Sequence, residues 1–235
     1  MVLLYKKCSL DNNFRGKAGD YNMKKISFVF LLIFSLSIIS GKEYKCEIKN
    51  DLFNTVEEYV LDKYQFVENG IKLEYTIEHN IEDELKRINN LLRDKSDFIV
   101  SKNKNCITAK GKDIKYNISI FDYNEILKIE IVIINNNEDI LLDDLRGLAK
   151  EILNNNFLDK RYFYFVKSKL NEFNNDVIKD VKSNLPIEII ESLNITNGVI
   201  ANATIKGKED INIGQINYDT GSYLVIGTPI IFITY

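Results

Sequence analysis

The chain has 235 residues, of which 45% are hydrophobic and 28% are charged, with a formal net charge of −3. This apolar content supports a folded core and excludes a chain that is disordered throughout. Residues 1–41 hold six of the 31 basic and two of the 34 acidic residues, so residues 42–235 carry 25 against 32 and a net charge near −7, which argues against nucleic acid as a partner.

The region around Met23 has the pattern of an export signal. Met23-Lys24-Lys25 is a short basic start, residues 26–39 are uncharged and apolar, and Ser40-Gly41 supplies small residues for cleavage. The apolar part is shorter than the ~20 residues of a membrane-spanning helix. We therefore predict a signal peptide over residues 23–41 and no transmembrane anchor after its cleavage. An uncleaved anchor is the alternative, because an A-x-A motif is missing.

This prediction fixes the compartment and the start of the chain. A signal peptide is read at the N-terminus, so we interpret residues 1–22 as a misassigned, untranslated start. The mature protein is expected to be extracytoplasmic, either secreted or associated with the cell surface. Only Cys46 and Cys106 remain after cleavage. In an oxidising compartment they can form a disulfide or stay as buried free thiols, and the sequence leaves both possibilities open.

Hydrophobic periodicity predicts the elements of residues 42–136. A helix is expected over residues 51–64, with a break at Asn69-Gly70 and an alternating strand over residues 71–78. Asn80 then caps a helix with an apolar stripe through Leu92. Four strands on short connections follow, which can only be antiparallel; they are expected over residues 97–101, 106–110, 114–121 and 126–134.

The same order of elements recurs after residue 137. The pattern predicts helices over residues 138–154 and 170–185 on either side of an aromatic strand, residues 161–168. A short helical turn is expected over residues 187–193, followed by strands over residues 199–206, 211–218 and 223–235.

This repetition leads to a prediction of the fold class. We expect an α+β fold of two similar halves, residues 42–136 and 137–235, with a boundary near Asn135 to Asn137. Each half is expected to be a curved antiparallel sheet backed by helices.

The string Asp219-Thr220-Gly221-Ser222 is the sharpest catalytic pattern. Aspartic proteases present a carboxylate in an Asp-Thr-Gly loop and need two such loops, whereas this chain has one. A homodimer could supply the second loop. The string lies between two alternating strands, however, where Asp-x-Gly is ordinary turn chemistry, and we predict a hairpin turn.

The other polar candidates are weaker. His79 is the only histidine, at a strand-to-helix junction, so a multi-histidine zinc site is excluded. The adjacent acidic pairs Glu57-Glu58 and Asp143-Asp144 lie on predicted helices, where neighbours point about 100° apart, and we interpret them as solvated faces. The aromatic run Tyr162-Phe163-Tyr164-Phe165 either lines a ligand groove or forms a strand buried on both faces, and the second interpretation is favoured. We predict no catalytic, cofactor-binding or metal-binding residue.

The last nine residues, Gly227-Thr228-Pro229-Ile230-Ile231-Phe232-Ile233-Thr234-Tyr235, resemble the C-terminal string of the YwmB family of exported bacterial proteins. The resemblance implies a two-part α+β fold like the saddle of the TATA-box-binding protein. It implies nothing about DNA, because an exported acidic protein lacks both access to promoters and a basic face. The family supplies no catalytic residues to carry over.

We therefore expect an exported, non-enzymatic protein that binds a cell-envelope protein or glycan through a concave sheet or an exposed strand edge. The alternative is an envelope enzyme that cleaves a glycan with two carboxylates, which leaves no linear motif.

Overall fold

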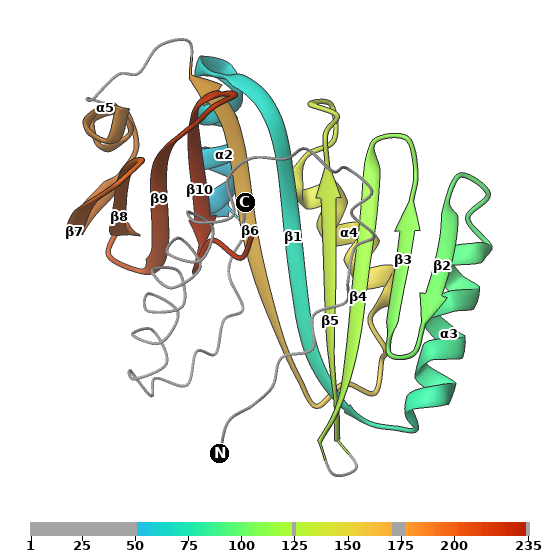
Figure 1. Ribbon diagram of the computed structural model, residues 1–235. Helices are drawn as coiled ribbons and strands as arrows, with labels where there is room; N and C mark the ends of the chain where they lie inside the picture. Colours follow the sequence, from blue (N-terminus) through green and yellow to red (C-terminus); the bar gives the residue numbers. More distant parts are fainter. Residues whose placement is uncertain (1–50, 124–125, 171–176, 234–235) are drawn as a thin grey trace. The chain divides into compact units, whose positions relative to one another are not determined.

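The computed structural model describes residues 51–123, 126–170 and 177–233, which belong to one compact unit, Glu47–Tyr235. The described helices are α2 (Asp51–Lys63), α3 (Ile81–Arg93), α4 (Leu142–Ile152) and α5 (Val177–Asn184). The described strands are β1 (Gln65–Glu78), β2 (Ile99–Asn103), β3 (Cys106–Lys110), β4 (Ile114–Tyr123), β5 (Ile126–Asn135), β6 (Asp159–Leu170), β7 (Ile187–Ile195), β8 (Gly198–Ile205), β9 (Glu209–Tyr218) and β10 (Gly221–Thr228) (Figure 1).

All ten described strands form one antiparallel sheet, in the order β2-β3-β4-β5-β1-β6-β10-β9-β8-β7. The prediction of two halves that each have their own sheet backed by helices, as in the TATA-box-binding saddle, is therefore wrong. Strands from both sides of the expected boundary at residues 135–137 share this sheet.

The pairing of β1 with β6 is the reason for this difference. Eleven residue pairs join Gln65–Thr76 of β1 to Asp159–Lys169 of β6, near the middle of the sheet. Periodicity reports which residues of a strand face a core, but it does not report which distant strand lies alongside. The antiparallel order predicted for the four strands β2 to β5 is confirmed.

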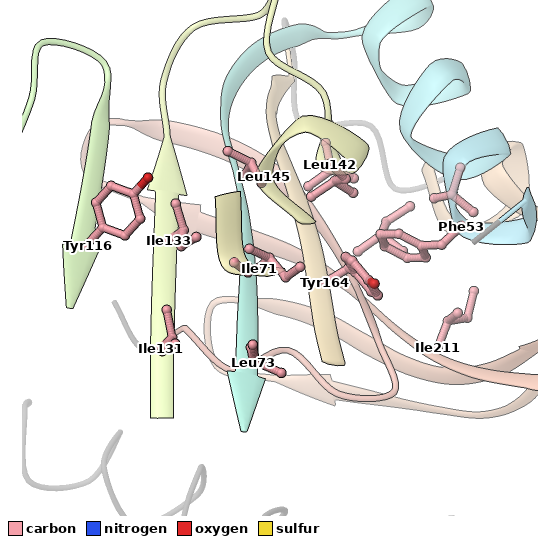
Figure 2. Close-up of a cluster of buried hydrophobic side chains, with 14 of the residues drawn as sticks. Phe53, Ile71, Leu73, Tyr116, Ile131, Ile133, Leu142, Leu145, Tyr164 and Ile211 are labelled. Carbon is pink, nitrogen blue, oxygen red and sulfur yellow. The ribbon is translucent and has the colours of Figure 1, made fainter. Parts of the chain in front are cut away.

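The described helices cover one face of the sheet (Figure 1). Alternate residues of β1, namely Ile71, Leu73, Tyr75 and Ile77, are buried in the same cluster as residues of all four helices. Figure 2 shows part of this core, where Leu142 and Leu145 of α4 lie over Ile71 and Ile133. The other face of the sheet, which carries the intervening residues such as Lys72 and Glu74, is called the outer face below.

The Asn69-Gly70 pair was predicted to break the chain between the helix and the strand that follows, but it lies inside β1. The Asn69 side chain is buried, donates to Glu57 Oε1 at 2.8 Å and accepts from Asn135 at 2.9 Å. Gly70 is required by packing, since a Cβ there would lie 2.4 Å from a ring carbon of Phe165. Tertiary contacts therefore override the local turn preference of this dipeptide.

Two further predictions of local structure are wrong. The expected helical turn at residues 187–193 is part of edge strand β7, whose Ile187 and Ile189 pack on the core. The expected last strand, residues 223–235, ends at Thr228, before a cis peptide bond to Pro229. The Asn80 cap of α3 is confirmed: its side chain accepts from the backbone N–H groups of Glu82 and Asp83.

Candidate functional site

The outer face carries a row of charged residues across β5, β1 and β6. Glu74 is at its centre, with Lys72 Nζ at 2.7 Å, Lys128 Nζ at 3.3 Å and Arg161 at 3.4 Å from its carboxylate oxygens. Lys128 also contacts Glu130 at 2.8 Å. Burial raises the pKa of Glu74, but the positive charges of these neighbours outweigh it and the pKa is lowered. Glu74 is therefore an ionised partner of the cations and is unsuited to act as a general acid.

An aromatic cluster adjoins this row. The ring of Phe232 packs edge-on against Phe165, with centroids 5.3 Å apart, and against Phe163, at 6.5 Å. Lys72 Nζ lies 4.2 Å from the centroid of Phe163. Ile231 packs over Gly227, where a Cβ would approach its Cα to 3.1 Å. The residues after β10 thus return across the outer face and cover its aromatic side chains.

A hollow of about 320 Å³ lies farther along the outer face, near the β3–β4 hairpin. Its basic lining residues are Lys110, Lys112 and Lys115. The remaining lining residues are Glu68, Gly111, Asp113, Ile114, Asn117, Ile134 and Asn136. We call it the lysine hollow.

Lys110 and Lys115 face each other directly across β3 and β4. Like charges opposite one another destabilise a sheet unless a counter-charge lies nearby. Of the two acidic lining residues, Glu68 pairs with Lys167, which does not line the hollow, at 3.4 Å, and Asp113 lies 4.0 Å from Lys112, which does. Within the described residues neither Lys110 nor Lys115 forms a salt bridge. The lining thus holds three lysines and two carboxylates, and its facing pair Lys110 and Lys115 has no salt-bridge partner among the described residues, which favours the approach of an anion.

Burial clearly raises the pKa of two described carboxyl groups, and neither lines the hollow. Glu57 was predicted to be on a solvated face, but its exposed fraction is only 3%. Its carboxylate accepts hydrogen bonds from the Asn69 side chain and from the backbone N–H of Leu142, at 3.1 Å, at the start of α4. Burial raises its pKa to about 7. Glu209 accepts from the Thr228 hydroxyl at 3.3 Å. The two carboxyl groups have structural partners and no shared cleft.

The other sequence candidates are not brought together. Asp219 and Thr220 form the turn between β9 and β10, as predicted. His79 is exposed between β1 and α3, and Glu58, Asp143 and Asp144 are exposed. The aromatic strand is buried on both faces, as favoured, with Tyr164 under the helices and Phe165 on the outer face; their exposed fractions are 3% and 0%.

No group of three metal-ligating side chains occurs among residues 51–123, 126–170 and 177–233. In the same part of the chain, no helix has the length and apolar character to cross a membrane. The predicted signal peptide, residues 23–41, and the preceding residues 1–22 lie outside the described residues.

Cys106 is disulfide-bonded, and its partner lies outside the described residues. The possible partners within the chain are Cys8 and Cys46. Cys106 lies on β3, on the outer face, across from Ser119 of β4.

The lysine hollow could have been inferred from sequence by one further step. The strands ending at Lys110 and starting near Ile114 were predicted, with a turn between them. In a tight antiparallel hairpin the residues beside the turn face each other. The predicted bounds alone would place Lys110 opposite Ile114; a strand longer by one residue, in which Gly111 pairs with Ile114 as observed, places Lys110 opposite Lys115.

No protein-family model matches the chain, and no curated protein matches it. Among solved structures, the chain is similar to DynU16, a protein of the dynemicin biosynthetic locus, with 8% identity and a TM-score of 0.26. The match covers 68% of this chain and 86% of DynU16.

Proposed function

We propose that this chain is an exported, non-enzymatic protein that binds an anionic component of the cell envelope at the lysine hollow. The observation that carries the proposal is the uncompensated cross-strand pair Lys110 and Lys115. A Lys ammonium group acts as a point charge for phosphate and carboxylate groups. Two such groups on adjacent strands hold an anion at a fixed place, and the net negative charge of residues 42–235 disfavours its binding elsewhere.

Two observations support export. The order of residues 23–41 is that of a signal peptide, and the C-terminal string resembles that of the exported YwmB family. We propose membership of that family on the same grounds.

Binding is favoured over glycan cleavage by the state of the carboxyl groups. A glycosidase needs a protonated acid beside the sugar. The acidic residue at the centre of the outer face, Glu74, has a lowered pKa, whereas Glu57 and Glu209, whose pKa values are raised, contact structural partners.

Binding to two anionic polymers tests this function and separates the sources of the anion. Inorganic polyphosphate presents phosphates and polygalacturonate presents carboxylates. We expect the processed protein to bind at least one of them with an affinity that falls as salt rises. The double variant Lys110→Gln/Lys115→Gln should bind about tenfold more weakly, which corresponds to a loss of about one kcal/mol or more in the free energy of binding.

The matched control is Lys86→Gln/Lys150→Gln, which removes two exposed lysines from α3 and α4. It should bind as the native protein does. Equal losses in both double variants would mean that net charge alone drives binding. Failure of the native protein to bind either polymer would refute the proposal. Mass spectrometry of the N-terminus tests export separately, because a chain that begins at residue 1 or at Met23 has not been processed, whereas a start after Ser40 shows cleavage.

A further inference from the structure

Both edge strands of the sheet are bare within the described part of the chain. β2 and β7 occupy the two ends of the strand order, and no described strand pairs with their outer sides. An edge strand presents a row of unpaired N–H and C=O groups that can template another strand. Natural proteins protect such edges or use them for association.

Exposed apolar side chains occur at both edges. Ile99 of β2 is 81% exposed, and Ile190 and Leu193 of β7 are 67% and 53% exposed. Exposed apolar side chains that are grouped mark an interaction site more often than single ones do. β7 carries two of them and β2 carries one.

The two edges carry opposite charges. β2 and the turn after it contain Lys102 and Lys104 and no acidic residue, whereas β7 contains Glu188 and Glu191 and no basic residue. All four side chains are exposed. Pairing of two β7 edges, or of two β2 edges, would bring like charges together, while β2 against β7 brings opposite charges together.

Strand direction also permits this contact. Ten strands alternate in direction, so β2 and β7 run in opposite directions. A second copy in the same orientation therefore places its β2 antiparallel to β7, with both helical layers on one side. The bulge between Ile189 and Glu191 leaves residues 191–195 as a regular stretch of β7. Its length matches the five residues of β2.

We propose that copies of this chain associate head to tail, with the β2 edge of one copy paired to the β7 edge of the next. The contact is heterologous, so each copy keeps one free edge and assembly continues until a ring closes or a filament forms. The occupant of each edge is thus a second copy of this chain.

Charge reversal gives a test with an internal rescue. The full chain is expressed, and the processed protein is studied by sedimentation velocity over a rising concentration series. We expect the native protein to assemble beyond a dimer, and each of two variants, Lys102→Glu/Lys104→Glu and Glu188→Lys/Glu191→Lys, to weaken assembly about tenfold or more. Each variant on its own carries charge of the same sign on its β2 edge and its β7 edge, so the two edges repel.

An equimolar mixture of the two variants should assemble again, because each acidic edge then meets a basic one. The control Lys86→Glu/Lys150→Glu changes the same number of charges on α3 and α4 and should assemble as the native protein does. A native protein that stays monomeric at every concentration would overturn the proposal. So would assembly that survives Lys102→Glu/Lys104→Glu, which indicates β7–β7 pairing, or a mixture that stays dissociated.

Discussion

Glu57 shows how a single buried residue can connect several elements. It lies on α2, accepts from Asn69 of β1 and meets the first backbone N–H of α4. The positive end of the α4 dipole and these hydrogen bonds favour the carboxylate, but burial outweighs them and raises its pKa to about 7. The sequence shows only an acidic pair on a helix and gives no sign that one member is buried.

This pKa predicts a pH dependence of stability. Between the ordinary pKa of 4.5 and the raised value of about 7, the folded state binds more protons at Glu57 than the unfolded state. The contribution of Glu57 to the free energy of unfolding is therefore fully present below pH 4.5 and is lost as the pH rises through 7. Glu57→Gln should remove this slope and be more stable than the native protein at pH 8, by on the order of 3 kcal/mol at most.

Urea unfolding across this pH range measures the effect. The neighbouring variant Glu58→Gln, at an exposed position of the same helix, should keep the native slope. An unchanged slope in Glu57→Gln would show that the group does not titrate in this window.

Two glycines provide a matched test of packing. A Cβ at Gly70 would lie 2.4 Å from Phe165 and 2.8 Å from the Ile133 carbonyl oxygen, whereas a Cβ at Gly147 of α4 meets nothing within 4 Å. We expect Gly70→Ala to destabilise the protein by about 1–3 kcal/mol. Gly147→Ala should stabilise it by up to about 1 kcal/mol, because Ala favours a helix. Thermal unfolding of both variants measures this, and similar shifts in Tm would contradict the packing argument.

At the scale of elements, the residues after β10 stabilise the outer face. Phe232 contacts both Phe163 and Phe165, so Phe232→Ala should cost about 1–3 kcal/mol, less than a fully buried Phe because Phe232 is partly exposed. The control is Leu158→Ala, at a side chain that is 56% exposed, which should change stability by less than about 0.5 kcal/mol. Urea midpoints at an unchanged m-value measure both. Equal losses would show that the segment does not pack as described.

Most elements could be predicted because each has one buried side. The alternation of Ile71, Leu73, Tyr75 and Ile77 and the helical spacing of Leu85, Ile88 and Leu92 both report a face on the core. The errors occur where a distant contact decides the conformation. The ring of Phe165 fills the space where a side chain at position 70 would lie, so Gly70 is required inside the strand. Residues 187–193 form a strand because they pair with β8. For the lysine hollow, the sequence supplied the two strands but not the cavity.

At the scale of the whole described unit, one sheet joins two successions of the same elements. The order helix, strand, helix and four strands occurs from α2 to β5 and again from α4 to β10. β1 and β6 stand at the same place in each succession and pair with each other. The sequence could indicate the succession, but the hydrogen bonds that merge the sheets join residues about 90 positions apart.

This central pairing also sets the order in which the chain can fold. The hairpins from β2 to β5 and from β7 to β10 join neighbours in sequence, so the entropy of closing them is small. The pairings of β1 with β5 and β6, and of β6 with β10, close much longer loops. We therefore expect the sheet to be completed from its edges inward, with its central strands finding their partners last. In an exported chain, such late closure would keep the polypeptide open enough to be threaded through a membrane before it folds.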